Sequence, residues 1–254
     1  MAIADLTFND TPIENKNSLY KGQRIKLEAP YVAVGWNTVQ MRYLNPYNKN
    51  RVGLHTYMDT ADNNQYLYSQ FEAFHCHRVF PCFDQPDLKA KMTLSITCPQ
   101  DWKAVSNSIE QRYEDIKSGG GKRLMERHNL SWFMKFYKDV EVSLYEYEQT
   151  PRISCYLYAI CAGDYKVFTD TDPMYVPQRI FVRQSLVDCL RHELMFGITK
   201  TTLDFYQKNF GTRYPFTKVD HVMSPDYKYG AMENVGCITY SDDIMCSSKD
   251  MSIP

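Results

Sequence analysis

The chain has 254 residues, of which 44% are hydrophobic, so it is long enough to bury a large core in one or two domains. Its 29 basic and 30 acidic residues give a net charge of −1 and are mixed along the sequence. This balance differs from the basic surface of a nucleic-acid-binding protein, so we expect no nucleic-acid partner.

No apolar stretch approaches the roughly 20 residues that a membrane-spanning helix needs, so we expect no transmembrane segment. The first ten residues, MAIADLTFND, lack the basic start and apolar stretch of a secretory signal. The expected location is therefore cytoplasmic. Eight cysteines are scattered without a C-x-x-C pair, a pattern more typical of free thiols than of a disulfide framework.

Short runs rich in β-branched and aromatic residues fill the chain from Thr7 to about Phe168. Clusters of proline, glycine, asparagine and aspartate separate these runs, as expected where strands end. The pattern predicts mainly antiparallel β structure, with an exposed loop or hairpin tip at 117–123 (KSGGGKR). The predicted strands are RIKLEA (24–29), TVQMRYL (38–44), VGLHTYM (52–58), MTLSITC (92–98), SWFMKFY (131–137), VEVSLYEYE (140–148) and RISCYLYAI (152–160).

Residues 184–210 change to helical periodicity, because apolar residues recur every three or four positions. The pattern predicts one helix, or two with a bend near Gly197. After Gly211, the short extended segments VDHVM and CITY are joined by the loop SPDYKYGAMENVG (224–236). Acidic turn residues and a proline at 169–173 place the expected domain boundary there, with a first domain of residues 1–168 and a second of residues 169–254.

Two local motifs could indicate metal binding, but neither is complete. His192 and Glu193 begin an H-E-x-x-H pattern, yet residue 196 is phenylalanine where the second histidine belongs. On a strand, His75 and His77 would share one face, but two ligands are too few for a metal site. We therefore expect no catalytic residue and no metal ligand in this chain. We interpret His192 and Glu193 as a solvated helix face, and His75 and His77 as partly buried polar strand residues.

Two longer segments carry a family resemblance: YSQFEAFHCHRVFPCFDQPDLKAKM (68–92) and VDHVMSPDYKYGAMENVGCITY (219–240). The first resembles the block QFE…FPCFDEP…KA, and the second the block PDF…GAMENxGLITY, of the zinc aminopeptidases that include aminopeptidase N and puromycin-sensitive aminopeptidase. Residues 230–234 match the GAMEN signature of that family at all five positions. Further segments match in the same order, so the resemblance covers roughly residues 50–245.

The resemblance implies a mainly β fold with an α+β C-terminal part: a β-saddle N-terminal domain followed by the first portion of a thermolysin-like domain. In that family the zinc-binding H-E-x-x-H helix comes after the GAMEN loop. We therefore expect the first domain to lack the first strands of the family and the second to stop before the zinc motif. Zinc is expected in a complete family member, and no cofactor in this chain.

The resemblance also implies which residues bind substrate. Glu233 would hold the free α-amino group of a peptide, with Gln70 and Glu72 as partners from the β domain. The backbone of Gly230 and Ala231 would form an edge that pairs with the peptide. An ammonium ion that leaves water needs charge-assisted hydrogen bonds, which carboxylates supply. The full set of implied substrate-binding residues is Gln70, Glu72, Gly230, Ala231, Met232, Glu233 and Asn234.

The segment FPCFDQP looks structural. We expect a buried corner between strands in which Asp84 accepts hydrogen bonds from local N–H groups. The family usually has an arginine where this chain has His77, and a glutamate where it has Gln85. The residues expected in the corner are Phe80, Pro81, Phe83, Asp84 and Pro86.

Together these features favour the N-terminal portion of a zinc aminopeptidase-like metallopeptidase, which recognises the free N-terminus of a peptide but does not hydrolyse it alone. Its expected partners are the peptide N-terminus and a protein partner or C-terminal segment that completes the second domain. One alternative is a catalytically inactive relative that serves as a structural subunit of a larger assembly. A third hypothesis is a binding module that keeps the amine anchor without the chemistry.

Overall fold

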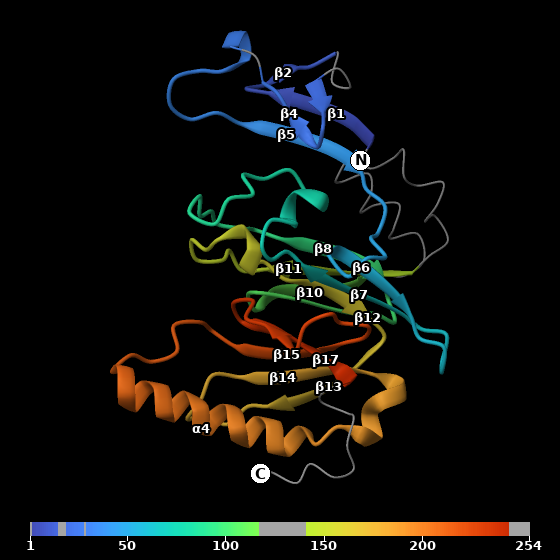
Figure 1. The fold of residues 1–254 in the computed structure, drawn as a ribbon, viewed down its shortest axis with the longest axis vertical. Helices are drawn as coiled ribbons and strands as arrows, with labels where there is room; N and C mark the ends of the chain where they lie inside the picture. The colour runs from blue at the N-terminus through green and yellow to red at the C-terminus, as the bar shows by residue number, and fades with distance from the viewer. Residues whose placement is uncertain (1, 15–18, 28, 117–140, 244–254) are drawn as a thin grey trace.

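The computed structural model describes residues 2–14, 19–27, 29–116 and 141–243. Strands dominate this part of the chain, and α4 (His192–Phe210) is its one long helix. The sheets are stacked along the long axis, with the N-terminal strands at one end and α4 at the other (Figure 1). The structure confirms the predicted fold class, mainly β with an α+β part near the C-terminus.

A small three-stranded sheet in the order β2-β1-β5 begins the chain. A register shift between Ile3 and Asp5 places Ile3, Leu6 and Phe8 on one buried face, because a bulge moves the strict alternation of side chains by one residue. These side chains form a separate cluster with Ile13. The elements are β1 (Ala2–Phe8), β2 (Thr11–Pro12), β3 (Tyr20–Lys21), β4 (Arg24–Ile25), the 3-10 helix η1 (Ala29–Tyr31) and β5 (Val39–Leu44).

Two antiparallel sheets follow, in the orders β6-β7-β12-β9 and β10-β11-β8. They confirm the predicted antiparallel β structure of this region. The elements are β6 (Gly53–Met58), β7 (Gln65–Gln70), the 3-10 helix η2 (Cys76–Arg78), β8 (Ser95–Pro99), β9 (Lys103–Ser106), β10 (Glu110–Ile116), β11 (Val142–Tyr147), the 3-10 helix η4 (Cys155–Leu157) and β12 (Ile160–Gly163).

The last described region is a five-stranded mixed sheet in the order β13-β14-β15-β17-β16. The three central strands run parallel, and α4 lies in the connection between the first two of them. A parallel pair needs such a crossover, and a helix commonly supplies it. The elements are β13 (Tyr165–Asp170), β14 (Gln178–Arg183), the 3-10 helix η5 (Gln184–Cys189), β15 (Val219–Ser224), β16 (Ala231–Met232) and β17 (Cys237–Ser241).

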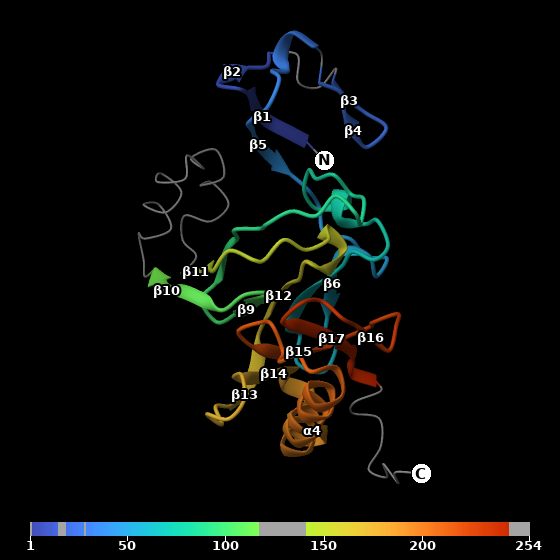
Figure 2. The same ribbon diagram turned by 90° about the vertical axis from the view of Figure 1, so that its left-hand side faces the viewer.

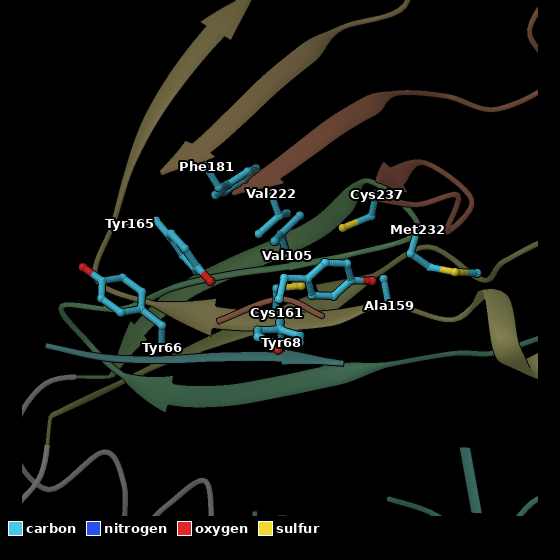
Figure 3. Close-up of a cluster of buried hydrophobic side chains, with 11 residues drawn as sticks. Tyr66, Tyr68, Val105, Ala159, Cys161, Tyr165, Phe181, Val222, Met232 and Cys237 are labelled. Atoms are coloured by element: carbon cyan, nitrogen blue, oxygen red, sulfur yellow. The ribbon is translucent and has the colours of Figure 1, made fainter. Parts of the chain in front are cut away.

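Both faces of this sheet are covered. Along β14, Ile180 and Val182 pack with Met195 and Phe196 of α4, whereas Phe181 between them faces the other way. On that second face, side chains of the four-stranded and five-stranded sheets point toward one another and form a shared cluster (Figure 3). The two antiparallel sheets β6–β12, with the loops that flank them, are called the β domain below. A common hydrophobic core joins this β domain to the sheet that carries the GAMEN segment.

The predicted helix from 184 to 210 is partly wrong. Residues 184–189 form the 3-10 helix η5, and α4 begins only at His192. The break lies at Leu190, which has an extended backbone and buries its side chain in the cluster under α4. There is no break near Gly197, because α4 is continuous there. The helix ends at Gly211, whose left-handed φ of 68° closes the last turn.

The predicted strand 152–160 is also wrong in most of its length. Its central residues form η4, and β12 begins only at Ile160. Side chains replace the strand partners here, because Asn107 Oδ1 accepts from Ala159 N at 2.9 Å and Ser106 Oγ donates to Ala159 O at 2.7 Å. The predicted loop 117–123 and strand 131–137 lie outside the described residues.

The expected boundary between residues 168 and 169 falls inside β13. All of β13 pairs with β14, so the chain leaves the four-stranded sheet at β12 and enters the five-stranded sheet at Tyr165. The change of sheet is thus a few residues earlier than the change in composition. The division into two domains stays a prediction.

Candidate functional site

The GAMEN segment forms the outer edge of the five-stranded sheet. Its strand β16 pairs with β17 in antiparallel register, with Ala231 opposite Tyr240 and Met232 opposite Thr239. Figure 2 shows β16 beside β17 at one side of the sheet. Among the described residues no strand pairs with the other side of β16. An exposed edge of this kind can accept an extended peptide as an additional strand.

Side chains of the GAMEN segment alternate between buried and exposed positions. Met232 and Asn234 are buried, whereas Ala231 and Glu233 are exposed. Met232 enters the shared core, which fixes the segment from below (Figure 3). The carboxylate of Glu233 is therefore presented to solvent from a strand edge whose position is set by its neighbours.

A directed chain of hydrogen bonds joins the GAMEN segment to the β domain. Asn234 Nδ2 donates to Thr239 Oγ1 at 3.3 Å, and Thr239 Oγ1 donates to the hydroxyl of Tyr227 at 3.1 Å. The Tyr227 hydroxyl donates in turn to Oε1 of Gln70. Two residues that the family resemblance implied, Gln70 and Asn234, are thus linked through Thr239 and Tyr227.

Gln70 and Glu72 lie at the end of β7, beside Tyr227. Gln70 is only 1% exposed, and its Nε2 is a buried donor with no hydrogen-bond partner among the described residues. Glu72 is exposed. Burial raises the pKa of Tyr227, and the nearby charge of Glu72 raises it further. Tyr227 is therefore a neutral hydroxyl that donates to Gln70.

Asn107 and Gly236 fix the far end of the loop, and sequence analysis missed both. Asn107 Nδ2 donates to Val235 O and to Leu157 O, each at 2.8 Å. Gly236 has a φ of +66°, and a Cβ at this position would lie 2.3 Å from the carbonyl oxygen of Asn107. A glycine is required here by both backbone conformation and space. The sequence signal was the final glycine of GAMENVG, whose neighbour in space could not be identified.

A buried ion network lies under the same loop. Lys218 Nζ donates to the carbonyl oxygens of Ser106 and Gly236, each at 2.7 Å, and pairs with Asp220 at 2.6 Å. Asp220 also pairs with Arg179, which reaches Glu110 of the β domain at 3.0 Å. Every charge in this network has an opposite partner, as burial requires. The network ties the loop, the five-stranded sheet and the β domain together.

Asp226 holds the near end of the loop. It has a left-handed φ of 53°, and its carboxylate pairs with Arg51 and lies 3.6 Å from His55 Nε2. The hydroxyl of Tyr68 donates to the carbonyl oxygen of Asp226 at 3.2 Å. Burial lowers the pKa of His55, although the Asp226 charge opposes this shift. Three β-domain residues therefore fix the turn that precedes the GAMEN segment.

The two incomplete metal motifs do not form a metal site. His192 is half-buried and stacks on Phe168 with 3.9 Å between ring centroids, whereas Glu193 is exposed. The prediction that His75 and His77 share a strand face is wrong, because His75 precedes η2 and His77 lies within it. His77 Nδ1 instead pairs with Asp84 at 2.6 Å. These residues do not fit the zinc site of an aminopeptidase.

The corner around Asp84 matches expectation only in part. Asp84 accepts a hydrogen bond from His77 N at 3.0 Å, which confirms its bond to a local N–H group. The expected burial of the corner is wrong, because Phe83 is 82% exposed and Pro81 and Pro86 are also exposed. The carbonyl oxygens of Phe83 and Pro86 accept side-chain hydrogen bonds from Cys155 and Ser154, which attach the exposed corner to the start of η4.

Comparison with known proteins gives two matches to models of one family. Residues 1–126 match the peptidase M1 N-terminal domain, and residues 194–253 match the peptidase family M1 domain. No helix in the described ranges is both long and apolar enough to cross a membrane.

Individual relatives agree with these matches. The chain is 31% identical to aminopeptidase N of Streptomyces lividans over 251 residues, covering 97% of this chain and 26% of that protein. It is 28% identical to aminopeptidase N of Rattus norvegicus over 189 residues, covering 74% of this chain and 18% of that protein. A probable aminopeptidase 1 of Sulfurisphaera tokodaii is 26% identical over 206 residues, covering 81% of this chain and 23% of that protein. The chain thus spans about a quarter or less of the length of these relatives, and it belongs to peptidase family M1, the zinc aminopeptidases.

Proposed function

We propose that this chain recognises the free N-terminus of a peptide for an M1 aminopeptidase. The observation that carries the proposal is the hydrogen-bonded chain from Asn234 through Thr239 and Tyr227 to Gln70. It supports a single site built from the GAMEN edge and the end of β7. The carboxylates of Glu233 and Glu72 are both exposed, and we assign both to this site.

The chemistry of a peptide N-terminus fits these groups. The ammonium ion is a donor, so it pairs with the carboxylates of Glu233 and Glu72. Gln70 offers the donor Nε2, which cannot bind an ammonium ion, and we assign it to the carbonyl oxygen of the first peptide residue. The backbone at Gly230 and Ala231 accepts the peptide as a strand. Glu233 and Glu72 thereby select chain ends over internal peptide segments.

The sequence given does not contain the zinc-binding motif of the family. The pattern H-E-x-x-H does not occur in residues 1–254, and His192 is committed to its contact with Phe168. In a complete family member zinc supplies a Lewis acid and an activated water. The proposal therefore assigns binding and orientation of the peptide to this chain, and cleavage to residues outside it. The cytoplasm remains the proposed compartment.

The test is calorimetric binding of one short peptide with a free amino terminus and of the same peptide acetylated there. We expect binding of the free form, at least tenfold weaker binding of the acetylated form, and a similar loss for Glu233→Gln with the free form. Glu193→Gln is the matched control, because Glu193 is an exposed acid on α4, away from the site. Equal affinity for the two peptides would contradict the proposal.

A second candidate function is a structural subunit of a larger assembly. The observation that favours it is the exposure of large apolar side chains along α4, where Ile198, Phe205 and Phe210 are 55%, 59% and 72% exposed. Such apolar surface is commonly covered by a partner or by more of the same chain. Light scattering of the purified chain tests this: a stable monomer of 29.8 kDa at high concentration argues against a required partner.

A further inference from the structure

Three cysteines that are far apart in the sequence meet in one cluster. Cys76 lies in η2, Cys82 in the corner that follows, and Cys155 at the start of η4. Their Sγ atoms all lie within 4.8 Å of one another. No other group of three ligand residues within the described ranges comes this close together.

The fold clamps these thiols together from two sides. The segment before η4 is bridged to the corner, because Ala90 and Ile153 exchange backbone hydrogen bonds of 3.0 Å each. Ser154 Oγ donates to the carbonyl oxygen of Pro86. The turn at η2 is closed by the bond from Val79 N to Cys76 O at 2.9 Å. The cluster is therefore held by local structure around each of its members.

The surroundings of the cluster combine an apolar wall with one carboxylate. Cys76 and Cys155 are buried among aromatic and aliphatic side chains, including Phe71, Ile153 and Tyr158. Cys82 is half-buried, so it provides the access from solvent. Asp84 Oδ1 lies 3.4 Å from Cys155 Sγ, while its Oδ2 is held by His77. The Asp84 carboxylate is therefore an oxygen donor beside the three thiols.

We propose that Cys76, Cys82 and Cys155 bind one thiophilic metal ion with a filled d shell, zinc(II) or copper(I). Three thiolates select such soft ions over magnesium or calcium. A metal–sulfur bond of about 2.3 Å needs sulfur atoms about 3.8 Å apart, so side-chain rotations that bring the thiols about 1 Å closer complete the site. Each sulfur that binds the ion loses its proton to solvent, so binding releases up to three protons.

The two ions differ in what else they need. Copper(I) is satisfied by the three sulfurs alone. Zinc takes four ligands, and the Asp84 carboxylate or a water molecule at the half-buried Cys82 side provides the fourth. None of the three cysteines belongs to an H-E-x-x-H pattern, and the proposal is independent of the peptide-binding function.

The experiment titrates the reduced full chain with one metal at a time, under argon. Cobalt(II) reports a zinc-type site through the visible absorption of a thiolate-bound tetrahedral ion, and zinc then displaces it. Copper(I) is offered in competition with a coloured copper(I) chelator. We expect one ion to bind per chain, either in the cobalt and zinc titration or in the copper(I) competition. Binding should also release protons, which are measured in a weakly buffered solution.

Single serine variants identify the ligands. We expect Cys82→Ser and Cys155→Ser each to weaken binding by at least tenfold. Cys161→Ser is the matched control, because Cys161 is buried beside Cys237 but has no third thiol near it among the described residues. The unmodified chain gives a second measurement that does not depend on folding of a variant. One equivalent of the bound metal should protect Cys82 from alkylation at least tenfold, while the exposed Cys189 reacts as before.

Several results would overturn the proposal. One such result is a reduced chain that binds neither cobalt(II) nor copper(I). Another is metal binding by Cys82→Ser and Cys155→Ser that is as tight as that of the control Cys161→Ser. Unchanged alkylation of Cys82 in the presence of metal would have the same meaning. A disulfide that forms between two of these thiols while one equivalent of metal is present would show a redox pair in place of a metal site.

Discussion

The loop 224–236 and the helix α4 both connect strands of the five-stranded sheet, but different kinds of contact hold them in place. After Ser224, the last residue of β15, the loop has only two residues of regular structure, but Asn107, Tyr68 and Gln70 of the β domain bind it along its length. The helix has 19 residues of regular structure, but only Met195 and Phe196 are buried. Order at the candidate site therefore comes from contacts between sheets, and not from local secondary structure.

A large loss of stability is expected where the loop contacts the β domain. Gly236→Ala places a Cβ 2.3 Å from the Asn107 carbonyl oxygen at a φ of +66°. Neither the clash nor the backbone strain can relax without breaking the Asn107 bond to Val235, so we expect a loss of at least ~3 kcal/mol in the free energy of unfolding. Urea denaturation followed by circular dichroism measures it.

The helix supplies the matched control for that substitution. A Cβ at Gly197 meets nothing within 4 Å and lies in the middle of α4. Gly197→Ala should therefore stabilise the protein by about 0.5–1 kcal/mol, because alanine loses less backbone entropy on folding. Similar unfolding energies for the two variants would mean that the loop is not anchored as described.

Acid should weaken the link between the sheet and α4. His221 lies on β15, with Thr199 of α4 at 3.4 Å and the Tyr240 hydroxyl at 3.1 Å. Burial lowers the pKa of His221 to about 4, while Asp220 raises it and Lys218 lowers it by smaller amounts. The unfolded chain binds this proton near pH 6.5 and the folded chain only near pH 4, so stability is lost as pH falls between these values.

The expected loss at His221 is about 2 kcal/mol between pH 7 and pH 5. The variant His221→Gln has no proton to bind, so its unfolding energy should fall by that much less over the same interval. Urea midpoints at pH 8, where His221 is neutral in both states, give the separate effect of losing the ring. Parallel pH profiles of the two proteins would show that His221 is not the acid-sensitive group.

Much of the loop could be predicted because its sequence pattern is local and specific. The GAMEN motif located the segment, and the QFE motif located Gln70, which accepts from Tyr227 of the loop. That Glu72 is a partner of the segment stays a prediction. The short strands 39–44 and 219–223 followed from β-branched residues between turn signals. What the sequence could not supply is the tertiary neighbour of each residue. Asn107 lies in a region with no motif, and Tyr227 was only one aromatic residue among 33 tyrosines and phenylalanines.

For α4, the sequence predicted the helix but not the face that it buries. Periodicity correctly indicated a helix near residues 192–210, but the residues that set the period, Leu194, Ile198 and Phe205, are not those that are buried. Met195 and Phe196 are buried because Ile180 and Val182 face them from the sheet. Sequence spacing cannot choose between two apolar stripes on one helix, since the partner surface decides. The thiol cluster was missed for the same reason: residues 76, 82 and 155 are close only in the fold.

A smaller effect should reveal which peptide atom Gln70 meets. Gln70→Glu keeps the acceptor for the Tyr227 hydroxyl but replaces the free donor Nε2 with a carboxylate oxygen. If Nε2 donates to the first carbonyl oxygen, this change weakens binding of a free-amine peptide about tenfold, or ~1.4 kcal/mol. Calorimetry measures the affinity at pH 7.

The opposite result at Gln70 is equally informative. Tighter binding of the peptide by Gln70→Glu would show that this position faces the ammonium ion, and the assignment to the carbonyl oxygen would be wrong. Glu72→Gln is the matched control, because it removes a charge from the same end of β7 and is expected to weaken binding under either arrangement. Thermal melting of each variant separates a loss of affinity from a loss of structure.

The smallest effect is expected on the outer face of α4. Ile198 is 55% exposed, so Ile198→Ser should change the free energy of unfolding by less than about 0.5 kcal/mol in the isolated chain. Phe196→Ala, two residues earlier and 6% exposed, should cost ~3–5 kcal/mol because it opens a cavity against the sheet. If instead Ile198→Ser destabilises the chain strongly in a concentration-dependent manner, the outer face is buried in an assembly, which would favour the structural-subunit function. An unchanged midpoint at every concentration would mean that α4 packs through one face only, whereas the loop is held by the β domain along its length and leaves Glu233 exposed to solvent.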